Sequence, residues 1–510
     1  MGYAFVYTQP AQSLTNVRAH DVTILVFNGE DRTMTTVSTS SVTPAFDVAV
    51  LGAGPGGYIA AIRAAQLGLK VAIIERDALG GICLNWGCIP TKSLIRNAEI
   101  VELLKDGKTY GISFDNFQVD YGIAYKRSRE VSNRMTRGIE FLMKKNQVQV
   151  FKGEGTIISP TQIRVENKSD ERVISASAII VATGAKPLVL PFLPPDGRRV
   201  FTYRQLLEVQ TVPKSLIVIG SGAIGMEFAY VFHAYGADVT VIEALPRIMP
   251  LEDEEISAEI TRSFNRSGIK TITGAKVENA TIEDSGVTVH YDDGKAKQTI
   301  KADWVLSAVS VVPNTSGIGL EQMGVQMERG YVAVDEHLAT NVPTIYAIGD
   351  INGKLRLAHV ASAQGVIAAE SIAAMLGKYT GHIPKLDYDA MPRCTYTHPE
   401  VASMGMTEAQ ARDKGYEVKI SKAPFRASGR AVALNNFDGF VKIVADAKYG
   451  EILGVHMIGP EVTELLPEFV LAKSAELTPD QIASAVHAHP TLSEMLMEAA
   501  HGVEGLPLNF

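Results

Sequence analysis

The sequence contains only three cysteines in 510 residues. Secreted domains that are stapled by disulfides are rich in cysteine, so this scarcity excludes that class and favours a reducing compartment, which we expect to be the cytoplasm. Long hydrophobic runs are also lacking, because the most apolar stretch, residues 216–242, is interrupted by glycines, Glu227 and His233. A helix that spans a membrane needs about 20 consecutive apolar residues, so we expect none.

The chain has slightly fewer basic than acidic side chains. The chain has 48 Lys and Arg against 56 Asp and Glu, a formal net charge of −8, and it has no basic run. Proteins that bind nucleic acids or membrane surfaces usually concentrate positive charge, so we expect neither partner. The length suggests about three or four domains of ordinary size.

Residues 1–45 differ in character from the rest. They are rich in Thr, Ser and Val, without a helical period, and no basic stretch followed by an apolar core marks a secretory signal. Asp21, Glu30 and Asp31 argue against an organellar transit peptide. Two interpretations stay open: a disordered arm, or a translation start placed too early, with Met34 as the alternative start.

A dinucleotide-binding pattern begins at Phe46. Residues 46–51 form a short apolar run that predicts a buried parallel strand, and the glycine-rich stretch 52–57 opens a helix. The next apolar run ends at Glu75. Gly52 allows the tight turn, Gly54 lets the backbone approach a pyrophosphate, and Gly57 allows close packing of helix on strand. The helix N-terminus stabilises phosphate charge, and Glu75 accepts from ribose hydroxyls.

The same pattern recurs later in the chain. Residues 215–219 lead into Gly220, Gly222 and Gly225, and the following strand ends at Glu243. The spacing from first glycine to acid is the same in both copies. Two such folds imply two dinucleotides, although a second fold that stays empty is the alternative. Glu243 repels a 2′-phosphate, so we expect NAD rather than NADP at the second site.

Cys83 and Cys88 lie between these two patterns, shortly after the first. Two residues five apart in a regular helix hold their Cα atoms about 8–9 Å apart, whereas a disulfide needs about 4.4–6.8 Å. A bonded pair therefore requires a loop or distorted turn, which Gly87 and Pro90 suit. Pro90 also fits the first turn of a helix, where the positive end of the dipole favours a thiolate.

Other interpretations of the cysteine pair remain. Two buried cysteines without chemistry are possible, whereas no second Cys pair or Cys/His cluster supports a metal site, so we expect no metal. With two dinucleotides, the pair favours an electron path in which a flavin and a nicotinamide are joined to substrate by a dithiol–disulfide relay.

From about Phe46 to the C-terminus, these motifs resemble the pyridine nucleotide–disulfide oxidoreductase family. Three later stretches extend the resemblance: Val181-Ala182-Thr183-Gly184, the strand 345–350 that ends in Asp350, and Leu357-Ala358-His359. The resemblance implies an α/β fold with two Rossmann-like dinucleotide-binding domains and an α+β C-terminal dimerisation domain. It also implies FAD and NAD as cofactors and a homodimer.

The resemblance also implies where the domains lie. We expect an N-terminal extension over 1–45, the first part of the FAD-binding domain over 46–188 and the NAD-binding domain over 189–312. The second part of the FAD-binding, or central, domain would cover 313–385, and the dimerisation domain 386–510.

The resemblance assigns residues to each cofactor. The residues implied for FAD are Gly52, Gly54, Gly57, Glu75, Lys92, Gly155, Thr183, Gly184, Asp350, Leu357, Ala358 and His359. Those implied for NAD are Gly220, Gly222, Gly225 and Glu243.

The catalytic residues are likewise assigned by resemblance. It implies a redox-active Cys83–Cys88 disulfide, with Cys83 as the outer sulfur and Cys88 facing the flavin. Lys92, four residues past Cys88, and Glu227, in the first turn of the second Rossmann helix, would form an ion pair beside the flavin. Each alone would pass for a surface charge.

The C-terminal stretch 487–494 contains His489 and Glu494, which the resemblance makes the base and its orienting carboxylate. In relatives this segment reaches the cysteine pair of the other subunit. Without the resemblance, His487 and His489 are equally open to metal binding or simple packing.

Within the family, the chain is most similar to the members that oxidise dihydrolipoamide and reduce NAD. The partners implied are lipoyl domains and the acyltransferase core of a 2-oxo acid dehydrogenase complex, or a glycine cleavage system. The alternatives are glutathione reductase and a catalytically minor flavoprotein subunit of a multienzyme complex. The C-terminal cysteine pair of mercuric reductase is absent.

Some positions depart from the family pattern. Ser310-Val311-Val312 stands where relatives usually carry Gly-Arg-x, so we expect an effect on the strength and pose of NAD binding. Gln364 stands where an acid is common. Cys394 has no partner in sequence and is expected to be structural.

Overall fold

The computed structural model describes residues 24–25, 36–37 and 44–510. The chain divides into two units, Met1–Ala45 and Phe46–Phe510. In the first unit, β1 (Ile24–Leu25) and β2 (Thr36–Val37) form an antiparallel pair. Everything else expected of the N-terminal extension, including the alternative start at Met34, lies outside the described residues.

The first Rossmann-like sheet has a core of parallel strands in the order β5-β4-β3-β8-β21. These strands are β3 (Phe46–Leu51), β4 (Val71–Glu75), β5 (Gln149–Lys152), β8 (Asp170–Val181) and β21 (Ile345–Ala347). The first half of β8 continues as an antiparallel extension with β7 (Gln162–Asn167) and β6 (Glu154–Ser159). Because the core strands are parallel, their carboxyl ends meet at one edge, which is where α/β folds bind ligands.

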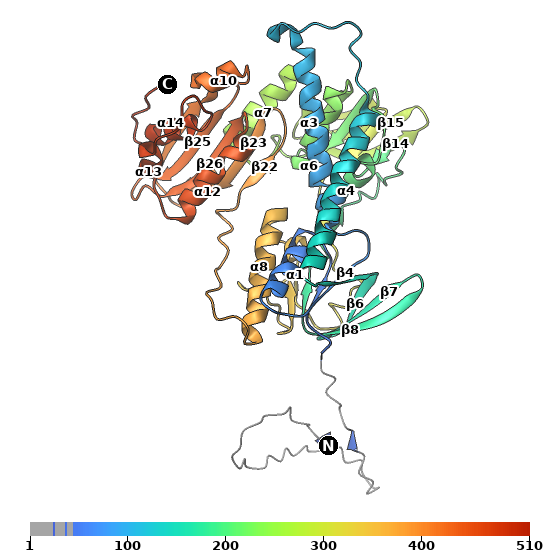
Figure 1. Ribbon diagram of the computed structural model, residues 1–510. Helices are drawn as coiled ribbons and strands as arrows, with labels where there is room; N and C mark the ends of the chain where they lie inside the picture. Colours follow the sequence, from blue (N-terminus) through green and yellow to red (C-terminus); the bar gives the residue numbers. More distant parts are fainter. Residues whose placement is uncertain (1–23, 26–35, 38–43) are drawn as a thin grey trace. The chain divides into compact units, whose positions relative to one another are not determined.

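Helices α1 (Pro55–Gln66) and α8 (Ala358–Met375) lie side by side against this sheet although they are far apart in sequence (Figure 1). Their contact is close because Gly365 faces α1: a Cβ there would lie 2.6 Å from the carbonyl oxygen of Gly56. The short strands β19 (Met327–Glu328) and β20 (Tyr331–Val332) pair with each other, and β20 contacts η2 (Gly349–Asn352), which follows β21. The late segment therefore completes a fold that began 300 residues earlier.

The second Rossmann-like sheet is also wholly parallel, in the order β10-β17-β11-β12-β13. Its strands are β10 (Val200–Phe201), β11 (Ser215–Ile219), β12 (Asp238–Ile242), β13 (Lys270–Ile272) and β17 (Trp304–Ser307). Its helices are α5 (Tyr203–Leu206), α6 (Ala223–Ala234) and α7 (Glu254–Ser267). The chain between β13 and β17 forms a separate antiparallel sheet of β14 (Lys276–Glu283), β15 (Gly286–Asp292) and β16 (Lys297–Ala302). Strands β9 (Ala185–Pro187) and β18 (Val311–Pro313) pair where the chain passes between the two folds.

A helical insertion between β4 and β5 joins the two Rossmann-like folds. It comprises α2 (Gly81–Trp86), α3 (Cys88–Lys105), η1 (Gly107–Tyr110) and α4 (Tyr121–Lys145). Leu94, Ile95 and Ala98 on α3 belong to the same buried cluster as Met226 and Ala229 on α6. The cysteine-bearing helices are thereby held against the second nucleotide-binding unit.

The C-terminal domain is a five-stranded antiparallel sheet in the order β22-β23-β26-β25-β24. Its strands are β22 (Arg393–Thr395), β23 (Glu400–Gly405), β24 (Val418–Pro424), β25 (Phe440–Asp446) and β26 (Ile452–Gly459). Its helices are α9 (Glu408–Asp413), η3 (Phe425–Ala427), α10 (Gly429–Ala433), α11 (Val462–Leu465), α12 (Pro467–Ser474), α13 (Pro479–Ser484) and α14 (Glu494–Val503). The predicted fold class, two Rossmann-like domains and an α+β C-terminal domain, is confirmed.

The C-terminal domain contains a half-buried carboxyl group, Glu400, at the start of β23. Its Oε2 accepts hydrogen bonds from the backbone N–H of Thr463 at 3.1 Å and from the Thr463 hydroxyl at 2.8 Å. Burial raises the pKa of Glu400 to about 7, although the two Thr463 hydrogen bonds oppose the shift. The ionised form is therefore disfavoured in the folded state.

The raised pKa of Glu400 predicts a pH dependence of stability. Since the folded pKa exceeds the unfolded one, Glu400 lowers the stability as pH rises through the window between about 4.5 and about 7. Replacing Glu400 by Gln should remove that loss and favour the variant over wild type by on the order of 2 kcal/mol more at pH 8 than at pH 5. Urea unfolding of both proteins at the two pH values measures the difference, and parallel pH dependences would contradict it.

Candidate active site

The first glycine-rich loop has the steric features that its sequence predicts. Gly52 has φ +102°, and a Cβ there would lie 2.4 Å from the carbonyl oxygen of Ala182. A Cβ on Gly57 would lie 1.9 Å from the carbonyl oxygen of Gly52, so helix and strand pack too closely for any side chain. A Cβ on Gly54 would meet nothing within 4 Å. The steric reasons for these glycines are confirmed, and the pyrophosphate on the open side of Gly54 remains a prediction.

The second loop repeats this arrangement. Gly220 has φ +101°, and its Cβ would lie 2.6 Å from the carbonyl oxygen of Ala308. A Cβ on Gly225 would lie 2.1 Å from the carbonyl oxygen of Gly220, whereas Gly222 faces open space. The two loops are therefore built alike, at the carboxyl edges of two different sheets.

The acid of each fold is fixed by backbone hydrogen bonds. Glu75 accepts from the N–H of Ala53 at 2.8 Å and from the N–H of Asp77 at 2.8 Å. Glu243 accepts from the N–H and hydroxyl of Ser221 at 2.9 and 2.7 Å, and from the N–H of Leu245 at 2.9 Å. Each carboxylate thus ties the glycine-rich loop to the loop after its own strand, which orients it at the edge where a ribose would lie.

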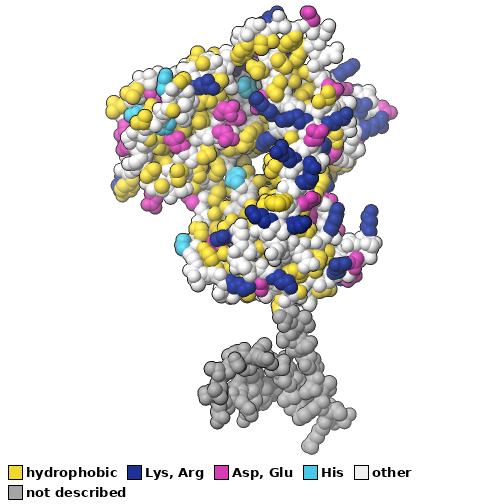
Figure 2. All heavy atoms as spheres, in the orientation of Figure 1, with side chains coloured by type: hydrophobic (Ala, Val, Ile, Leu, Met, Phe, Trp, Pro, Cys, Tyr) yellow, Lys and Arg dark blue, Asp and Glu magenta, His cyan; other side chains and the backbone are white. Residues whose placement is uncertain are grey.

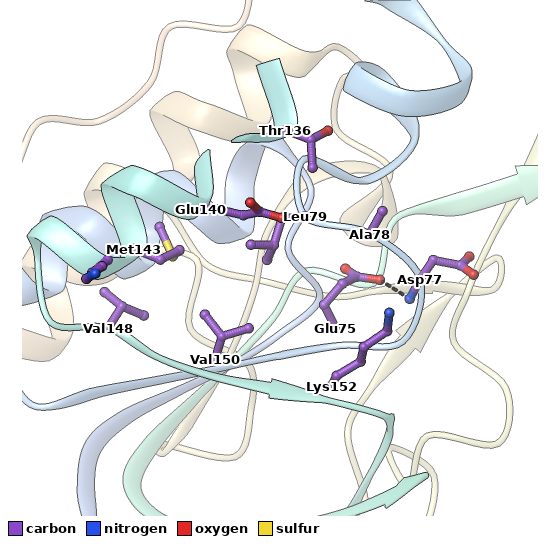
Figure 3. Close-up of a pocket in the computed structure, with 11 residues that line it drawn as sticks. Glu75, Asp77, Ala78, Leu79, Thr136, Glu140, Met143, Val148, Val150 and Lys152 are labelled. Atoms are coloured by element: carbon purple, nitrogen blue, oxygen red, sulfur yellow. Dashed lines mark hydrogen bonds between the residues drawn. The ribbon is translucent and has the colours of Figure 1, made fainter. Parts of the chain in front are cut away.

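A cavity of about 530 Å³ adjoins Glu75 (Figure 3). Met143, Val148 and Val150 supply apolar lining, and Glu75 and Lys152 supply charges of opposite sign. Asp77, Glu140 and Lys144 add further charges around the apolar side chains. A lining that combines apolar side chains with polar groups suits a planar base linked to a ribose. Together with the open side of Gly54, this cavity fits the adenosine half of a dinucleotide such as FAD.

The two cysteines lie on different helices that meet at Gly87. Cys83 belongs to α2, Cys88 is the first residue of α3, and Gly87 between them has φ −147° and ψ −112°. The distortion that a bonded pair requires therefore falls at Gly87, as predicted. Pro90 lies in the first turn of α3, which also agrees with the prediction. Both cysteines are free thiols and half-buried.

The two thiols are electrostatically unequal. The hydrogen bond with Cys88 and then burial raise the pKa of Cys83. The hydrogen bond from Cys83 lowers the pKa of Cys88, and the Lys92 ammonium lowers it further against the effect of burial. Cys88 also stands at the positive end of the α3 dipole, which favours a thiolate. The structure therefore makes Cys88 the more acidic of the pair.

Lys92 and Glu227 form the ion pair that the resemblance implies. The Lys92 Nζ lies 2.8 Å from both Glu227 carboxylate oxygens, and Glu227 is buried. A third segment completes this cluster: the backbone N–H of Tyr396 donates to Glu227 at 3.1 Å, and the Lys92 Nζ lies 4.5 Å from the centre of the Tyr396 ring. Nothing in the sequence pattern pointed to Tyr396.

His489 and Glu494 also form a pair. The His489 Nδ1 lies 2.8 Å from Glu494 Oε1, while the imidazole is exposed. Burial acts to raise the pKa of Glu494, but the N–H of Thr491 and the His489 ring lower it below its ordinary value. In the part of the chain that the structure describes, no hydrogen bond or ion pair joins His489 to Cys83 or Cys88, so the shared site remains a prediction.

The other residues expected to bind FAD lie largely at the carboxyl edge of the first sheet. The Thr183 hydroxyl donates to Asn314 O at 2.9 Å, and the Asn314 side chain donates back to Thr183 O at 2.9 Å. Gly184 has φ +67°, and its carbonyl accepts from the N–H of Asn314 at 2.9 Å. Burial raises the pKa of Asp350, against the influence of Arg356. These contacts tie the crossover after β8 to the segment after β18.

Helix α8 starts at the predicted Leu357-Ala358-His359 segment. Leu357 is the N-cap, Ala358 is the first helical residue, and the His359 Nε2 lies 2.8 Å from the carbonyl oxygen of Pro392. Gly155 lies on β6, where a Cβ would be 2.4 Å from Leu51 Cδ1, which gives this glycine a packing reason of its own.

Two of the departures from the family pattern, Gln364 and Ser310, have structural explanations. Gln364 is fully buried and accepts from the N–H of Gly349 at 2.6 Å while its amide donates to the Tyr388 hydroxyl at 3.1 Å, so a neutral amide satisfies this site. Ser310 occupies the position after β17 that Gly184 occupies after β8, but its φ lies outside the left-handed region. A serine is therefore tolerated sterically at Ser310. Burial raises the pKa of Cys394 to about 12, as befits a structural thiol.

Comparison with known families identifies the class. The pyridine nucleotide-disulphide oxidoreductase family matches residues 46–365, and the dimerisation domain of the same family matches residues 391–500. The chain belongs to this family. The members that resemble it use FAD and NAD. The chain also carries the family's dimerisation domain. In the described part of the chain, no helix is long and apolar enough to cross a membrane.

Several curated relatives that match most of the chain are dihydrolipoyl dehydrogenases. The chain is 48% identical to that of Mycobacterium leprae over 473 residues, covering 91% of this chain and 99% of the relative. It is 45% identical to that of Zymomonas mobilis over 467 residues, with the same coverage. Among solved structures, LpdA from Mycobacterium tuberculosis matches with a TM-score of 0.82 and 29% identity, covering 89% and 99% of the two chains. The HOCl-induced flavoprotein disulfide reductase RclA from Escherichia coli matches with a TM-score of 0.77 and 27% identity, again covering 89% and 99%.

Proposed function

We propose that this protein is an NAD-dependent dihydrolipoyl dehydrogenase that oxidises protein-bound dihydrolipoamide through a Cys83–Cys88 disulfide. The observation that carries the proposal is the unequal pair of thiols at the start of α3, with the more acidic Cys88 beside the Lys92–Glu227 ion pair. Relatives of that name are 43–48% identical over about nine-tenths of the chain. The alternative of a catalytically minor flavoprotein subunit is disfavoured because Cys83, Cys88, Lys92 and His489 are all present.

Oxidation of the substrate would begin when one of its thiolates attacks Sγ of Cys83 in the disulfide. A mixed disulfide with Cys83 forms, the Cys83–Cys88 bond breaks, and its electron pair leaves on Cys88 as a thiolate. The second substrate thiolate then attacks the substrate sulfur of the mixed disulfide. Cyclic oxidised lipoamide leaves, and Cys83 is released as a thiolate that takes up a proton.

His489 of the partner subunit would act as the base in both attacks. Its Nδ1 is engaged by Glu494, so Nε2 is the nitrogen left to take the proton from a substrate thiol. The carboxylate of Glu494 fixes the ring orientation and stabilises the imidazolium that forms. Glu494 suits this role because its lowered pKa keeps it ionised.

The positive charge of Lys92 would stabilise negative charge near the cysteine pair. Its ammonium lowers the pKa of Cys88, and the buried Glu227 carboxylate keeps that ammonium in place. FAD, when bound beside this cluster, would supply the electron acceptor that links the dithiol to NAD. The residues proposed to hold FAD and NAD are those of the two glycine-rich loops, Glu75, Glu243, the crossover at Thr183 and Gly184, Asp350 and the start of α8.

The proposed partners are proteins, because the proposed substrate, dihydrolipoamide, is carried on a protein. We expect lipoyl domains, borne by the acyltransferase core of a 2-oxo acid dehydrogenase complex or by a glycine cleavage system, to deliver the dithiol. We propose that residues 46–188 and 313–385 form the FAD-binding domain, residues 189–312 the NAD-binding domain and residues 386–510 the dimerisation domain. We expect the enzyme to act in the cytoplasm as a homodimer.

Steady-state assays test the proposed function. Purified protein should oxidise dihydrolipoamide with NAD, and should show far lower activity in reducing glutathione disulfide with either NADH or NADPH. A preference for glutathione disulfide and NADPH would identify the protein as a glutathione reductase instead. Absence of activity with every thiol substrate, in a protein that holds flavin, would favour the catalytically minor subunit.

Nucleotide choice gives a separate prediction. Glu243 is held at the edge of the second sheet by Ser221 and Leu245, where its charge repels a 2′-phosphate, so kcat/KM should strongly favour NAD over NADP. Glu243→Gln should lower kcat/KM for NAD, because a hydrogen bond to a charged group is worth about 1.5–3 kcal/mol. The kcat/KM for dihydrolipoamide serves as the control and should not change, because it reports only the half-reaction that precedes NAD. Equal efficiency with NADP in the unmodified enzyme would refute the role given to Glu243.

A further inference from the structure

Helix α7 belongs to the second Rossmann-like fold but lies against the C-terminal sheet of the same chain (Figure 1). Ion pairs hold both of its ends to the C-terminal domain. At its C-terminal end, Arg266 pairs with Asp438 on the surface. At its N-terminal end, Asp253 and Glu255 pair with Lys442 of β25, which is buried. The two ends therefore offer a comparison between an exposed and a buried contact of the same two domains.

Lys442 is the single buried Lys or Arg among the residues that the structure describes, with 2% of its side chain exposed. Figure 2 shows the ordinary place of such side chains, since Lys and Arg stand out on the visible surface. The Lys442 Nζ lies 3.0 Å from Asp253 Oδ1, 2.8 Å from Glu255 Oε2 and 3.0 Å from Glu408 Oε2. Burial acts to lower the pKa of Lys442, but hydrogen bonds to these carboxylates raise it above its ordinary value. The buried cation is therefore compensated by three acids.

The residue before the cap of α7, Glu252, is also held by the C-terminal sheet. Glu252 is 8% exposed, and its Oε2 accepts from the hydroxyl of Ser403 on β23 at 2.5 Å. The Nζ of Lys422 on β24 lies 2.5 Å from Glu255 Oε1. Side chains of β23, β24 and β25 thus hold residues 252–255, and we call these four residues with the side chains that hold them the α7 clamp.

A chain of buried hydrogen bonds runs from the α7 clamp to the second glycine-rich loop. The carbonyl oxygen of Met249 accepts from the N–H of Glu252 at 2.9 Å and from the hydroxyl of Ser257 on α7 at 3.2 Å. The Met249 N–H donates to the Ser221 hydroxyl oxygen at 3.0 Å. That hydroxyl donates in turn to Glu243 at 2.7 Å. The clamp is therefore joined to the acid of the second nucleotide site through Met249 and one hydroxyl group.

Met249 has a backbone conformation that depends on these contacts. Its φ is +47°, in the left-handed region that is uncommon for a residue with a long side chain, and it is 4% exposed. Such a conformation persists only where the surrounding structure holds it in place. Both its N–H and its carbonyl group are bound, the first by the nucleotide loop and the second by the start of α7. A disturbance of the clamp is therefore expected to reach Ser221 through Met249.

We propose that the α7 clamp orients Glu243 toward NAD, and that Lys442 is a positioning residue for the nucleotide. Lys442 fixes the start of α7, the start of α7 fixes Met249, and Met249 fixes the hydroxyl group that orients the carboxylate. The C-terminal domain would thereby set the affinity for NAD. Because coupling between two sites is reciprocal, bound NAD would also strengthen the clamp. The inference rests on the role proposed for Glu243 and is independent of the dithiol reaction.

Calorimetric titration of the flavin-loaded, full-length protein with ADP-ribose tests the proposal. ADP-ribose carries the adenine ribose of NAD without the nicotinamide, so its binding needs neither a redox reaction nor a thiol substrate. Lys442→Met should raise the Kd for ADP-ribose by about 2- to 30-fold, the range typical of residues that act on a distant site through their neighbours. The kcat/KM for NAD should fall by a similar factor, whereas the kcat/KM for dihydrolipoamide should not change.

A double-mutant cycle shows whether Lys442 acts through Glu243. Glu243→Ala alone should raise the Kd for ADP-ribose, which checks the role proposed for this acid separately. In the Glu243→Ala background, Lys442→Met should have less than a twofold further effect, because the carboxylate that it positions is gone. An equal effect of Lys442→Met in both backgrounds would show a general disturbance of the fold and would overturn the proposal.

The matched control is Arg266→Met, which removes the exposed ion pair at the other end of α7 and should leave the Kd within twofold of wild type. Lys442→Met leaves buried carboxylates without their cation. Ser257→Ala is therefore the milder second variant, because it removes only the hydroxyl that holds the Met249 carbonyl group, and it should raise the Kd at least about twofold. An unchanged Kd in Ser257→Ala or in folded Lys442→Met would overturn the proposal. So would an Arg266→Met protein that binds ADP-ribose as weakly as Lys442→Met.

Discussion

Replacing His489 by Gln should slow dihydrolipoamide oxidation by about 10²–10⁴-fold, the loss typical when an acid–base group is removed. The imidazole is exposed and oriented by Glu494, so glutamine removes the proton acceptor without disturbing a packed core. Steady-state kinetics with dihydrolipoamide and NAD measure the effect. Flavin content and the oxidation of NADH by an artificial acceptor, which need no substrate thiol, should both survive.

A mixed dimer shows whether that base works across the subunit boundary. One chain carries Cys83→Ser and the other His489→Gln, so a shared arrangement leaves one of the two sites with an intact cysteine pair and an intact base. About half of the wild-type activity is expected. A mixed dimer as inactive as the two parent variants would show that His489 serves the cysteines of its own chain.

Replacing Cys88 by Ser should abolish the long-wavelength charge-transfer absorbance that the two-electron-reduced enzyme is expected to show, together with turnover of dihydrolipoamide. Cys88 has the lowered pKa and stands at the N-terminus of α3 beside Lys92, so it is the sulfur that holds negative charge. Absorbance spectra recorded during anaerobic titration with dithionite measure the band.

The matched variant is Cys83→Ser, which should retain a thiolate at Cys88 and therefore retain the long-wavelength absorbance while losing turnover. The lowered pKa of Cys88 makes it the better leaving group, which suits attack of the substrate on Cys83. If Cys83→Ser lost the absorbance and Cys88→Ser kept it, the two roles would be reversed.

The parts of the structure that could be predicted from the sequence depend on local geometry. The reasons for Gly52, Gly57, Gly220 and Gly225 lie within a few residues along the chain or in one neighbouring strand, so the spacing of the motif contains them. The break at Gly87 was predictable for the same reason, because helix geometry and disulfide geometry conflict over a five-residue interval. Both Rossmann-like folds follow from such short-range patterns.

The parts that could not be predicted depend on segments far apart in the chain. Tyr396 touches Lys92 and Glu227 only because the start of the C-terminal sheet is packed against α3 and α6, and an aromatic residue after a short strand carries no such signal. Gln364 looked like a departure from an acidic position, yet it satisfies the N–H of Gly349 within a buried network.

The assignment of His489 to the active site was predictable only from the resemblance to the family. Its pairing with Glu494 spans five residues and is present in the structure. Its approach to the cysteine pair requires a second subunit, which neither periodicity nor the fold of one chain supplies. This step of the proposed mechanism therefore depends most on experiment.

The central claim is that a dithiol substrate reduces this protein through Cys83 and Cys88. Rapid anaerobic mixing of the oxidised, flavin-loaded enzyme with dihydrolipoamide, in the absence of NAD, tests it most directly. We predict prompt appearance of the long-wavelength absorbance in wild type, and its disappearance when NAD is then added. No absorbance change with dihydrolipoamide, in a protein whose flavin is reduced normally by NADH, would contradict the account.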